Sequence, residues 1–324
     1  MYSEKHFSER VESELSGLKL DRKPNRLYDP IKYMIGLGGK RLRPVLMLMT
    51  NELFDGNPDE IIKAAVGIEV FHNFTLLHDD IMDKAPLRRT KETVHKKWSP
   101  DIAILSGDTM FVLSCQLMMN VKSNYQKDVL NIFFKSAIEV CEGQQSDMDF
   151  ETENSVTIDE YLSMISQKTA SLIGCSAQLG ALCAGASEKD STLLYEFGKN
   201  LGIAFQLHDD ILDVYGDSEK FGKQVGGDIL SNKKTILLLT ALENADESIK
   251  SEIYSWINAT DFQPDQKIKT IKYLYEKLNV REKSTAIMDK YFSQSLKELN
   301  LVNVTDQKKE KLFDLAKRLM IREH

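Results

Sequence analysis

Proline is scarce in this chain of 324 residues, and its placement is informative. It occurs seven times, and none of the seven lies between Pro100 and Pro264. At the usual abundance of about 5%, that stretch would hold about eight prolines. Because proline is excluded from helix interiors, the long gap favours packed α-helices.

The sequence also has little cysteine and no excess of positive charge. Its net charge of −7 argues against a nucleic-acid-binding protein, which would carry a basic stripe or face. The N-terminus is charged, unlike a signal peptide, and no run of about 18 apolar residues is present to span a membrane. The cysteines lack zinc-ligand or redox spacing and are interpreted as small buried hydrophobes in a reducing, cytoplasmic compartment. They are Cys115, Cys141, Cys175 and Cys183.

Apolar residues recur at helical spacing through most of the chain, and almost no segment alternates with a period of two. Clusters of Gly, Asp, Asn and Pro separate the helical segments, but no linker marks a domain boundary. The sequence therefore predicts one all-α domain over residues 1–324. Helices are expected at 43–54, 59–83, 101–121, 124–151, 158–184, 190–213, 234–244 and 265–278, with two more toward the C-terminus.

An acidic octet occurs twice, as LLHDDIMD at 76–83 and QLHDDILD at 206–213. Each copy lies near the end of an apolar helical segment. Carboxylates at a helix C-terminus face the negative end of the helix dipole, so they lower stability unless a cation compensates. The repetition therefore favours a functional site over a solvated helix face.

The spacing of the octet aspartates suits a metal ion. In each octet the first and third aspartates are four residues apart, so their side chains emerge on one helix face. Oxygen ligands of this kind suit Mg²⁺, which commonly shares a phosphate with its protein ligands. We interpret the octets as two halves of one diphosphate site. Their aspartates are Asp79, Asp80, Asp83, Asp209, Asp210 and Asp213.

Basic residues that suit phosphate groups accompany the octets. GGKRLRP at 38–44 sets glycines and three cations at an expected helix start, where backbone amides and the helix dipole favour an anion. Each cation alone would be interpreted as a solvated charge, but the ordered set favours a phosphate site. The set is Lys40, Arg41, Arg43, Arg88, Arg89, Lys168, Lys223 and Lys233.

Taken in order, these motifs resemble the trans-isoprenyl diphosphate synthases of the polyprenyl synthetase family. The resemblance covers residues 30–235 and includes GGKRLRP, DDIMD followed by RR, GQQSD at 143–147, KT at 168–169, FQLHDDILD and GKQVGGD with KKT. It implies an all-α bundle of long helices around a deep central cavity, in a homodimer, with the aspartate clusters facing each other. Thr90 and Gln224 depart from the commoner residues, but neither is an implied ligand.

The resemblance also implies individual roles. Three Mg²⁺ ions, replaceable by Mn²⁺, would be bound by Asp79, Asp83 and Asp209, while the remaining octet aspartates support these ligands or hold metal-bound water. An allylic diphosphate (dimethylallyl, geranyl or farnesyl) would be held by Arg88, Lys168 and Lys223, and Lys233 is a further substrate-binding residue. Isopentenyl diphosphate would be bound by Lys40, Arg43, His72 and Arg89, and Arg322 resembles a basic residue that closes over this second substrate.

The implied reaction is ionisation of the allylic C–O bond, attack of the isopentenyl double bond on the resulting cation, and loss of a proton to the departed diphosphate. The hydroxyl of Thr169 and the amide oxygen of Gln206 would stabilise the cation by their dipoles. Gln206 is equally well interpreted as a buried amide that pairs helices.

Product length is expected to depend on the residues just before Asp79. Phe74 and Thr75 lie five and four residues upstream, a little over one helical turn deeper. An aromatic residue at the position of Phe74 resembles a floor that stops chain growth early, which favours geranylgeranyl diphosphate, with farnesyl diphosphate next. Phe74 could instead be an ordinary core aromatic.

Four other functions compete with this interpretation. A longer-chain polyprenyl diphosphate synthase would share every motif. A helical metal-dependent phosphohydrolase would need more histidine ligands than the six histidines here provide. A terpene cyclase would need no isopentenyl pocket, and an inactive prenyl synthase subunit would have lost aspartates.

Overall fold

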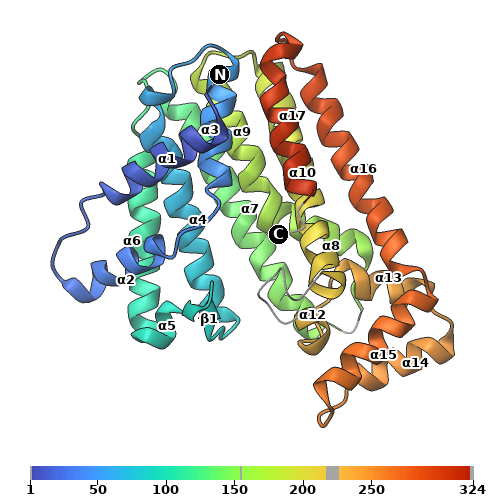
Figure 1. Cartoon of the computed structure of the whole chain (residues 1–324). Coiled ribbons are helices and arrows are strands. Elements are labelled where there is room, and N and C mark those ends of the chain that lie inside the picture. The colour runs from blue at the N-terminus through green and yellow to red at the C-terminus, as the bar shows by residue number, and fades with distance from the viewer. Residues whose placement is uncertain (1, 154, 217–225, 322–324) are drawn as a thin grey trace. The chain divides into compact units, whose positions relative to one another are not determined.

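The computed structural model describes residues 2–153, 155–216 and 226–321. They form two compact units that are almost wholly helical, which confirms the all-α prediction (Figure 1). Five helices contribute residues to both units: α7 (Gln126–Thr152), α9 (Ser171–Cys183), α10 (Glu188–Tyr215), α16 (Val280–Leu301) and α17 (Asp306–Met320). The predicted single domain and central cavity remain predictions. Unit 1 comprises Met1–Lys135, Cys175–Tyr195 and Leu301–Leu312, and unit 2 comprises Ser136–Gly174, Glu196–Asn300 and Phe313–His324.

Unit 1 is built around α4 and α6, which run side by side (Figure 1). Gly67 of α4 permits their close approach, because a Cβ atom there would lie 3.1 Å from the Ser114 carbonyl oxygen of α6. Helix α6 begins where the Ser99 hydroxyl accepts from the Ile102 amide and Pro100 occupies the first turn. The helices that begin in unit 1 are α1 (Glu4–Ser16), α2 (Asn25–Gly36), α3 (Leu42–Leu53), η1 (Pro58–Glu60), α4 (Ile62–Met82), α5 (Val94–Lys97), α6 (Pro100–Met118), α7 (Gln126–Thr152), α10 (Glu188–Tyr215) and α17 (Asp306–Met320).

Unit 2 packs apolar side chains around the second half of α10. Ile203, Leu207 and Ile211, spaced four residues apart, are all buried in its core. Helix α8 begins with a capping box in which the side chains of Thr157 and Glu160 each accept from the other's backbone amide. The helices that begin in unit 2 are α8 (Ile158–Ile165), η2 (Ser166–Ala170, a π-helix), α9 (Ser171–Cys183), α12 (Gly227–Leu230), α13 (Ile236–Asn244), α14 (Glu247–Ile257), α15 (Pro264–Lys277) and α16 (Val280–Leu301).

The structure differs from the expected helices in two respects. The single helix expected over 158–184 is divided by the π-helix η2, which apolar spacing does not reveal. In addition, α1, α2 and α14 form helices outside the expected ranges. α1 and α14 begin with side-chain caps, in which Ser3 accepts from the His6 amide and Asp246 from the Ile249 amide, and these caps carry a signal that hydrophobic periodicity missed. α2 begins without a side-chain cap.

The interpretation of the cysteines needs one correction. Cys175 and Cys183 are buried, as expected, but Cys115 is half-buried and Cys141 is exposed. None of the four forms a disulfide. Cys141 is thus a surface thiol on α7, because its position on the helix faces away from the packed side.

Helix α6 is strongly apolar although much of it is exposed. Among the described residues it is the one helix long and apolar enough to cross a membrane, with a mean hydropathy of 1.2, although only 33% of that window is buried. One such helix is a weak signal, since core helices of water-soluble proteins have the same length and composition. Its Asp101 and Asp108 are exposed.

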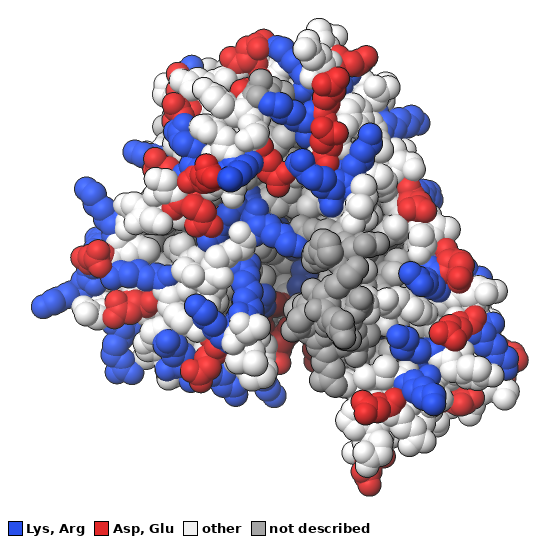
Figure 2. All heavy atoms as spheres, in the orientation of Figure 1, with Lys and Arg blue, Asp and Glu red and all other residues white. Residues whose placement is uncertain are grey.

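On the face drawn in Figure 2, Lys and Arg are interspersed with Asp and Glu. This pattern differs from the concentrated basic face of a nucleic-acid-binding protein.

A short hairpin follows α4 and was not expected from the sequence. Strand β1 (Leu87–Arg88) pairs antiparallel with β2 (Lys91–Glu92), and these strands are too short to show an alternating pattern. Both turn residues have positive φ, 52° at Arg89 and 67° at Thr90, as hairpin turns of two residues require. Thr90 is β-branched and rarely adopts this conformation.

We expect Thr90→Gly to raise the free energy of unfolding by about 1 kcal/mol, because glycine adopts positive φ without steric strain. Urea denaturation of the whole chain measures the change. Thr90→Ala is the matched control. Alanine keeps a Cβ atom, so this variant should raise the free energy of unfolding much less. A Thr90→Gly variant no more stable than Thr90→Ala would contradict strain at this turn.

Candidate active site

The GGKRLRP motif forms a tight turn before α3 in unit 1. Gly38 and Gly39 both have positive φ, at 81° and 146°. A Cβ atom on Gly39 would lie 2.9 Å from a guanidinium nitrogen of Arg89, so glycine lets the Arg89 side chain lie against the turn. Lys40 is exposed beside it. The turn therefore gathers cations from two separate sequence motifs.

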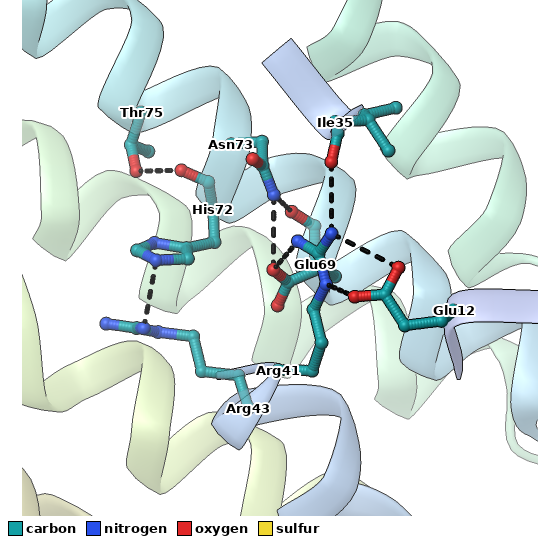
Figure 3. A network of polar contacts seen from close by, with 8 residues as sticks. All are labelled: Glu12, Ile35, Arg41, Arg43, Glu69, His72, Asn73 and Thr75. Atoms are coloured by element: carbon teal, nitrogen blue, oxygen red, sulfur yellow. Dashed lines mark hydrogen bonds and ion pairs between the residues drawn. The ribbon is translucent and has the colours of Figure 1, made fainter. Parts of the chain in front are cut away.

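Arg43 and His72 meet inside unit 1 (Figure 3). Arg43 Nη1 lies 3.2 Å from His72 Nε2. Burial lowers the pKa of Arg43 to about 10, so the guanidinium is still charged at neutral pH and donates to His72. Burial and the nearby charges of Arg43 and Arg89 hold the pKa of His72 well below its ordinary value. His72 is therefore neutral, with its proton on Nδ1.

Lys40, Arg43, His72 and Arg89, which we call the basic pocket, retain an unused donor. Among the described residues, nothing accepts from the buried Nε–H of Arg43. Buried donors are nearly always hydrogen-bonded in folded proteins, so an unpaired one beside a concentration of positive charge favours an anionic ligand. The pocket thus has the chemistry expected of a phosphate site.

The first acidic octet lies at the C-terminal end of α4. Asp80 is 2% exposed, and both of its carboxylate oxygens accept from Arg88 Nε at 2.8 Å. Burial raises the pKa of Asp80, while the Arg88 hydrogen bond lowers it. Asp79 Oδ2 lies 3.4 Å from Arg88 Nη2, and Asp83 caps the helix end. Arg88 thus supplies the compensating cation that these carboxylates need.

The second octet lies on α10 in unit 2, and its buried aspartate has partners of a different kind from those of Asp80. Buried Asp210 accepts from the Tyr161 hydroxyl of α8 and, at 3.0 Å, from Gln206 Nε2. Burial raises the pKa of Asp210 to about 7. Asp209 is exposed, and Asp213 accepts from the Asp228 amide at 2.9 Å. Hydrogen bonds, rather than an arginine, therefore hold this carboxylate.

Lys168 and Thr169 occupy the π-helix η2, a feature often found at functional sites. Lys168 Nζ lies 2.6 Å from Asp147 of the GQQSD motif. Gly143 of the same motif lets η2 approach α7, because a Cβ atom there would lie 2.3 Å from the Lys168 amide nitrogen. The Thr169 hydroxyl donates to Gln206 Oε1 at 3.3 Å. GQQSD therefore supports the lysine on η2.

Phe74 stands in a cluster of aromatic rings on α4 and α6. Its ring centroid lies 5.6 Å from Phe111 and 4.7 Å from His78. Gly107 of α6 makes room for His78, since a Cβ atom there would lie 2.2 Å from the imidazole. Thr75 donates to the carbonyl of His72 within its own helix. Phe74 is therefore held in place by neighbours on two helices.

The structure brings the expected residues together in two sets. In unit 1 are Lys40, Arg43, His72, Phe74, Thr75, Asp79, Asp80, Asp83, Arg88 and Arg89, and in unit 2 are Lys168, Thr169, Gln206, Asp209, Asp210, Asp213 and Lys233. That the two sets face each other stays a prediction. Lys223, Gln224 and Arg322 lie outside the described residues.

Sequence reasoning missed four residues that hold these sets in place. Asp147 had a signal, since it belongs to the GQQSD motif, but the motif alone did not point to Lys168. Tyr161, Glu12 and Glu69 had none, because each acts through a tertiary contact with a residue far away in sequence.

Comparison with known proteins identifies the family. The model of the polyprenyl synthetase family matches residues 24–278. The chain belongs to the polyprenyl synthetase family. A geranylgeranyl diphosphate synthase of Methanosarcina mazei is 36% identical, with 82% of each chain covered. A short chain isoprenyl diphosphate synthase of Methanothermobacter thermautotrophicus is 34% identical, with 98% of this chain and 97% of the relative covered.

Solved structures agree. A crystal structure of geranylgeranyl pyrophosphate synthase superposes with a TM-score of 0.94 at 43% identity and covers both chains completely. As a polyprenyl synthetase of the short-chain group, this chain is a trans-prenyltransferase.

The carboxylates of this polyprenyl synthetase fit a divalent metal ion that shares its coordination with a ligand. No group of three or more His, Cys, Asp or Glu side chains is gathered as a metal site in the part of the chain that the structure describes. Each octet instead offers two carboxylates four residues apart, since Asp80 and Asp210 are engaged elsewhere. A hard ion bound by so few carboxylates completes its coordination with water and phosphate oxygens.

The low pKa of His72 should make the polyprenyl synthetase sensitive to acid. Between the lowered pKa and the ordinary value of about 6.5, the unfolded chain binds a proton that the folded chain does not, so stability falls as pH drops through this range. His72→Gln keeps an acceptor for Arg43 but cannot titrate. We expect the free energy of unfolding of wild type, measured by urea denaturation, to fall more than that of the variant between pH 7 and pH 5. The difference should reach up to about 1.4 kcal/mol per pH unit. Equal losses would contradict a buried neutral His72.

Proposed function

We propose that this chain synthesises geranylgeranyl diphosphate by condensing isopentenyl diphosphate with an allylic diphosphate. The observation that carries the proposal is the contact between Arg43 of α3 and His72 of α4, where a buried guanidinium N–H has no acceptor among the described residues. A condensation needs a second diphosphate pocket, whereas a terpene cyclase does not. Relatives that carry the name geranylgeranyl diphosphate synthase support the product length.

In this proposal Asp79, Asp83 and Asp209 hold three Mg²⁺ ions, and Mn²⁺ can replace them. Bound Mg²⁺ would supply Lewis-acid neutralisation of the allylic diphosphate. Asp80 and Asp210 are better suited to support than to ligation, because Arg88 occupies one carboxylate and Tyr161 and Gln206 the other. Asp213 lends similar support through the Asp228 amide.

The chain's own cations and dipoles would assist the chemistry. Arg88, Lys168, Lys223 and Lys233 would neutralise the departing diphosphate, which then takes the proton lost from the isopentenyl unit. Gln206 donates its amide nitrogen to Asp210, and this fixes the amide so that Oε1 faces Thr169. The Gln206 oxygen and the Thr169 hydroxyl are thereby oriented as dipoles for an allylic cation.

Purified chain incubated with Mg²⁺, isopentenyl diphosphate and farnesyl diphosphate should yield geranylgeranyl diphosphate, read by mass spectrometry after dephosphorylation. Asp79→Ala should lower kcat by about 100-fold or more, because a ligand for the charge-neutralising ion is lost. Asp265→Ala, at an exposed carboxylate of α15, is the matched control and should retain activity. A cyclic hydrocarbon would identify a cyclase, and no turnover an inactive subunit.

Phe74→Ala should give a prenyl diphosphate longer than geranylgeranyl diphosphate. Removal of the ring leaves α4 intact but opens space for a longer hydrocarbon tail one helical turn before Asp79. Mass spectrometry of the dephosphorylated products measures the shift. Tyr273→Ala removes an exposed aromatic ring of α15 and should leave product length unchanged. An unaltered distribution for Phe74→Ala would mean that Phe74 is an ordinary core aromatic.

We further propose a cytoplasmic homodimer in which both units act as one domain. Leu105, Val112 and Met119 are 59%, 56% and 52% exposed and recur every seven residues, so they form one apolar face along α6. A second copy would cover this face. The four cysteines without disulfides suit a reducing compartment.

Leu105→Glu combined with Val112→Glu should halve the mass measured by light scattering, because two charges would be buried in the dimer interface. Tyr273→Glu, an equally drastic change at another exposed position, should leave the mass unchanged. A double variant of unaltered mass would place the dimer contact elsewhere.

A further inference from the structure

Arg41 stands in the sequence between Lys40 and Arg43. Figure 3 shows its side chain turned toward Glu12 and Glu69, whereas the side chain of Arg43 turns toward His72. The Arg41 side chain is 1% exposed, and each of its three guanidinium nitrogens donates a hydrogen bond within unit 1. Nε donates to Glu12 Oε1 at 2.7 Å, Nη1 to Glu69 Oε1 at 2.7 Å, and Nη2 to the Ile35 carbonyl at 3.0 Å. Arg41 is therefore unsuited to bind substrate.

The partners of Arg41 come from three helices. Glu12 lies on α1, Ile35 on α2 and Glu69 on α4. Glu69 also accepts from Asn73 Nδ2 at 3.2 Å, which extends the network one turn along α4. Since the turn at 37–41 leads directly into α3, the guanidinium ties the start of α3 to three other helices.

This network reaches both sides of the basic pocket. On one side, Arg41 has a φ of 50° and immediately follows Lys40, with Arg43 two residues later. On the other side, Glu69 lies three residues before His72 on the same helix, so the two side chains share a face of α4. The ion pair between Arg41 and Glu69 thus fixes the two chain segments whose side chains, Arg43 and His72, meet at 3.2 Å.

We propose that Arg41, with Glu12 and Glu69, is a positioning residue for the isopentenyl diphosphate pocket. The left-handed conformation of Arg41 is sterically unfavourable for any residue with a Cβ, and the ion pairs with Glu69 and Glu12 hold it. Without them, the turn relaxes and Lys40 and Arg43 no longer converge on one diphosphate. This inference rests on the proposed function, because it takes the pocket's ligand to be isopentenyl diphosphate.

Steady-state kinetics and calorimetry with isopentenyl diphosphate test this role. Arg41→Gln should raise the KM and the Kd for isopentenyl diphosphate by about tenfold, while the KM for farnesyl diphosphate changes by less than about twofold. Glu12→Gln, which alters a half-exposed partner and leaves no buried charge unpaired, should raise the same two constants by about threefold. Arg41→Lys should raise the KM and Kd for isopentenyl diphosphate less than Arg41→Gln does, but not leave them at the wild-type values, since lysine cannot bridge two carboxylates as the forked guanidinium does.

Arg10→Gln is the matched control. It breaks the exposed ion pair between Arg10 of α1 and Asp59, 2.5 Å apart, and should leave both constants unchanged. Should Arg41→Gln and Glu12→Gln lower only the melting temperature, or alter the KM of both substrates alike, the positioning role is overturned.

The calorimetric arm separates this inference from the proposed function. A wild-type chain that binds isopentenyl diphosphate without condensing it refutes the proposed function, and weaker binding by Arg41→Gln then still supports the positioning role. A wild-type chain that does not bind isopentenyl diphosphate overturns both.

Discussion

Removing a charged side chain from water costs several kcal/mol unless a partner offsets it, and this constraint shapes each motif of the chain. In each motif, two adjacent residues of like charge differ in burial. Arg41, Asp80 and Asp210 are buried and anchored, whereas their neighbours Lys40, Asp79 and Asp209 lie nearer the surface. The buried member fixes the backbone, and in the proposed function the outer member faces the ligand.

The two octets are nearly identical in sequence but electrostatically unlike. Asp80 is paired with the permanent charge of Arg88, whereas Asp210 is held by the neutral donors of Tyr161 and Gln206 and has a pKa of about 7. The first cluster keeps its balancing cation close by in sequence. In the second cluster, neutral donors hold the anchoring carboxyl, and burial raises its pKa into the neutral range.

The sequence was most informative where residues that act together lie within one helix, because their spacing then fixes their relative positions. Helical periodicity predicted α4 and α10, and spacing alone placed Asp79 with Asp83 and Asp209 with Asp213 on common helix faces. It could not find Glu12, Asp147 or Tyr161, because each contacts a residue at least 21 positions away, at a distance only tertiary packing determines. The hairpin at Thr90 was not predicted for a local reason, because strands of two residues are too short to show an alternating pattern in the sequence.

The π-helix η2 has a consequence for anyone who redesigns this chain. Its five residues occupy a turn that normally holds fewer, so the register of side chains shifts by about 100° between α8 and α9. A single helical wheel drawn through both helices would assign one of them the wrong faces. Substitutions in α9 must be chosen on a wheel that starts at Ser171, and inserting or deleting one residue in η2 would rotate Lys168 out of reach of Asp147.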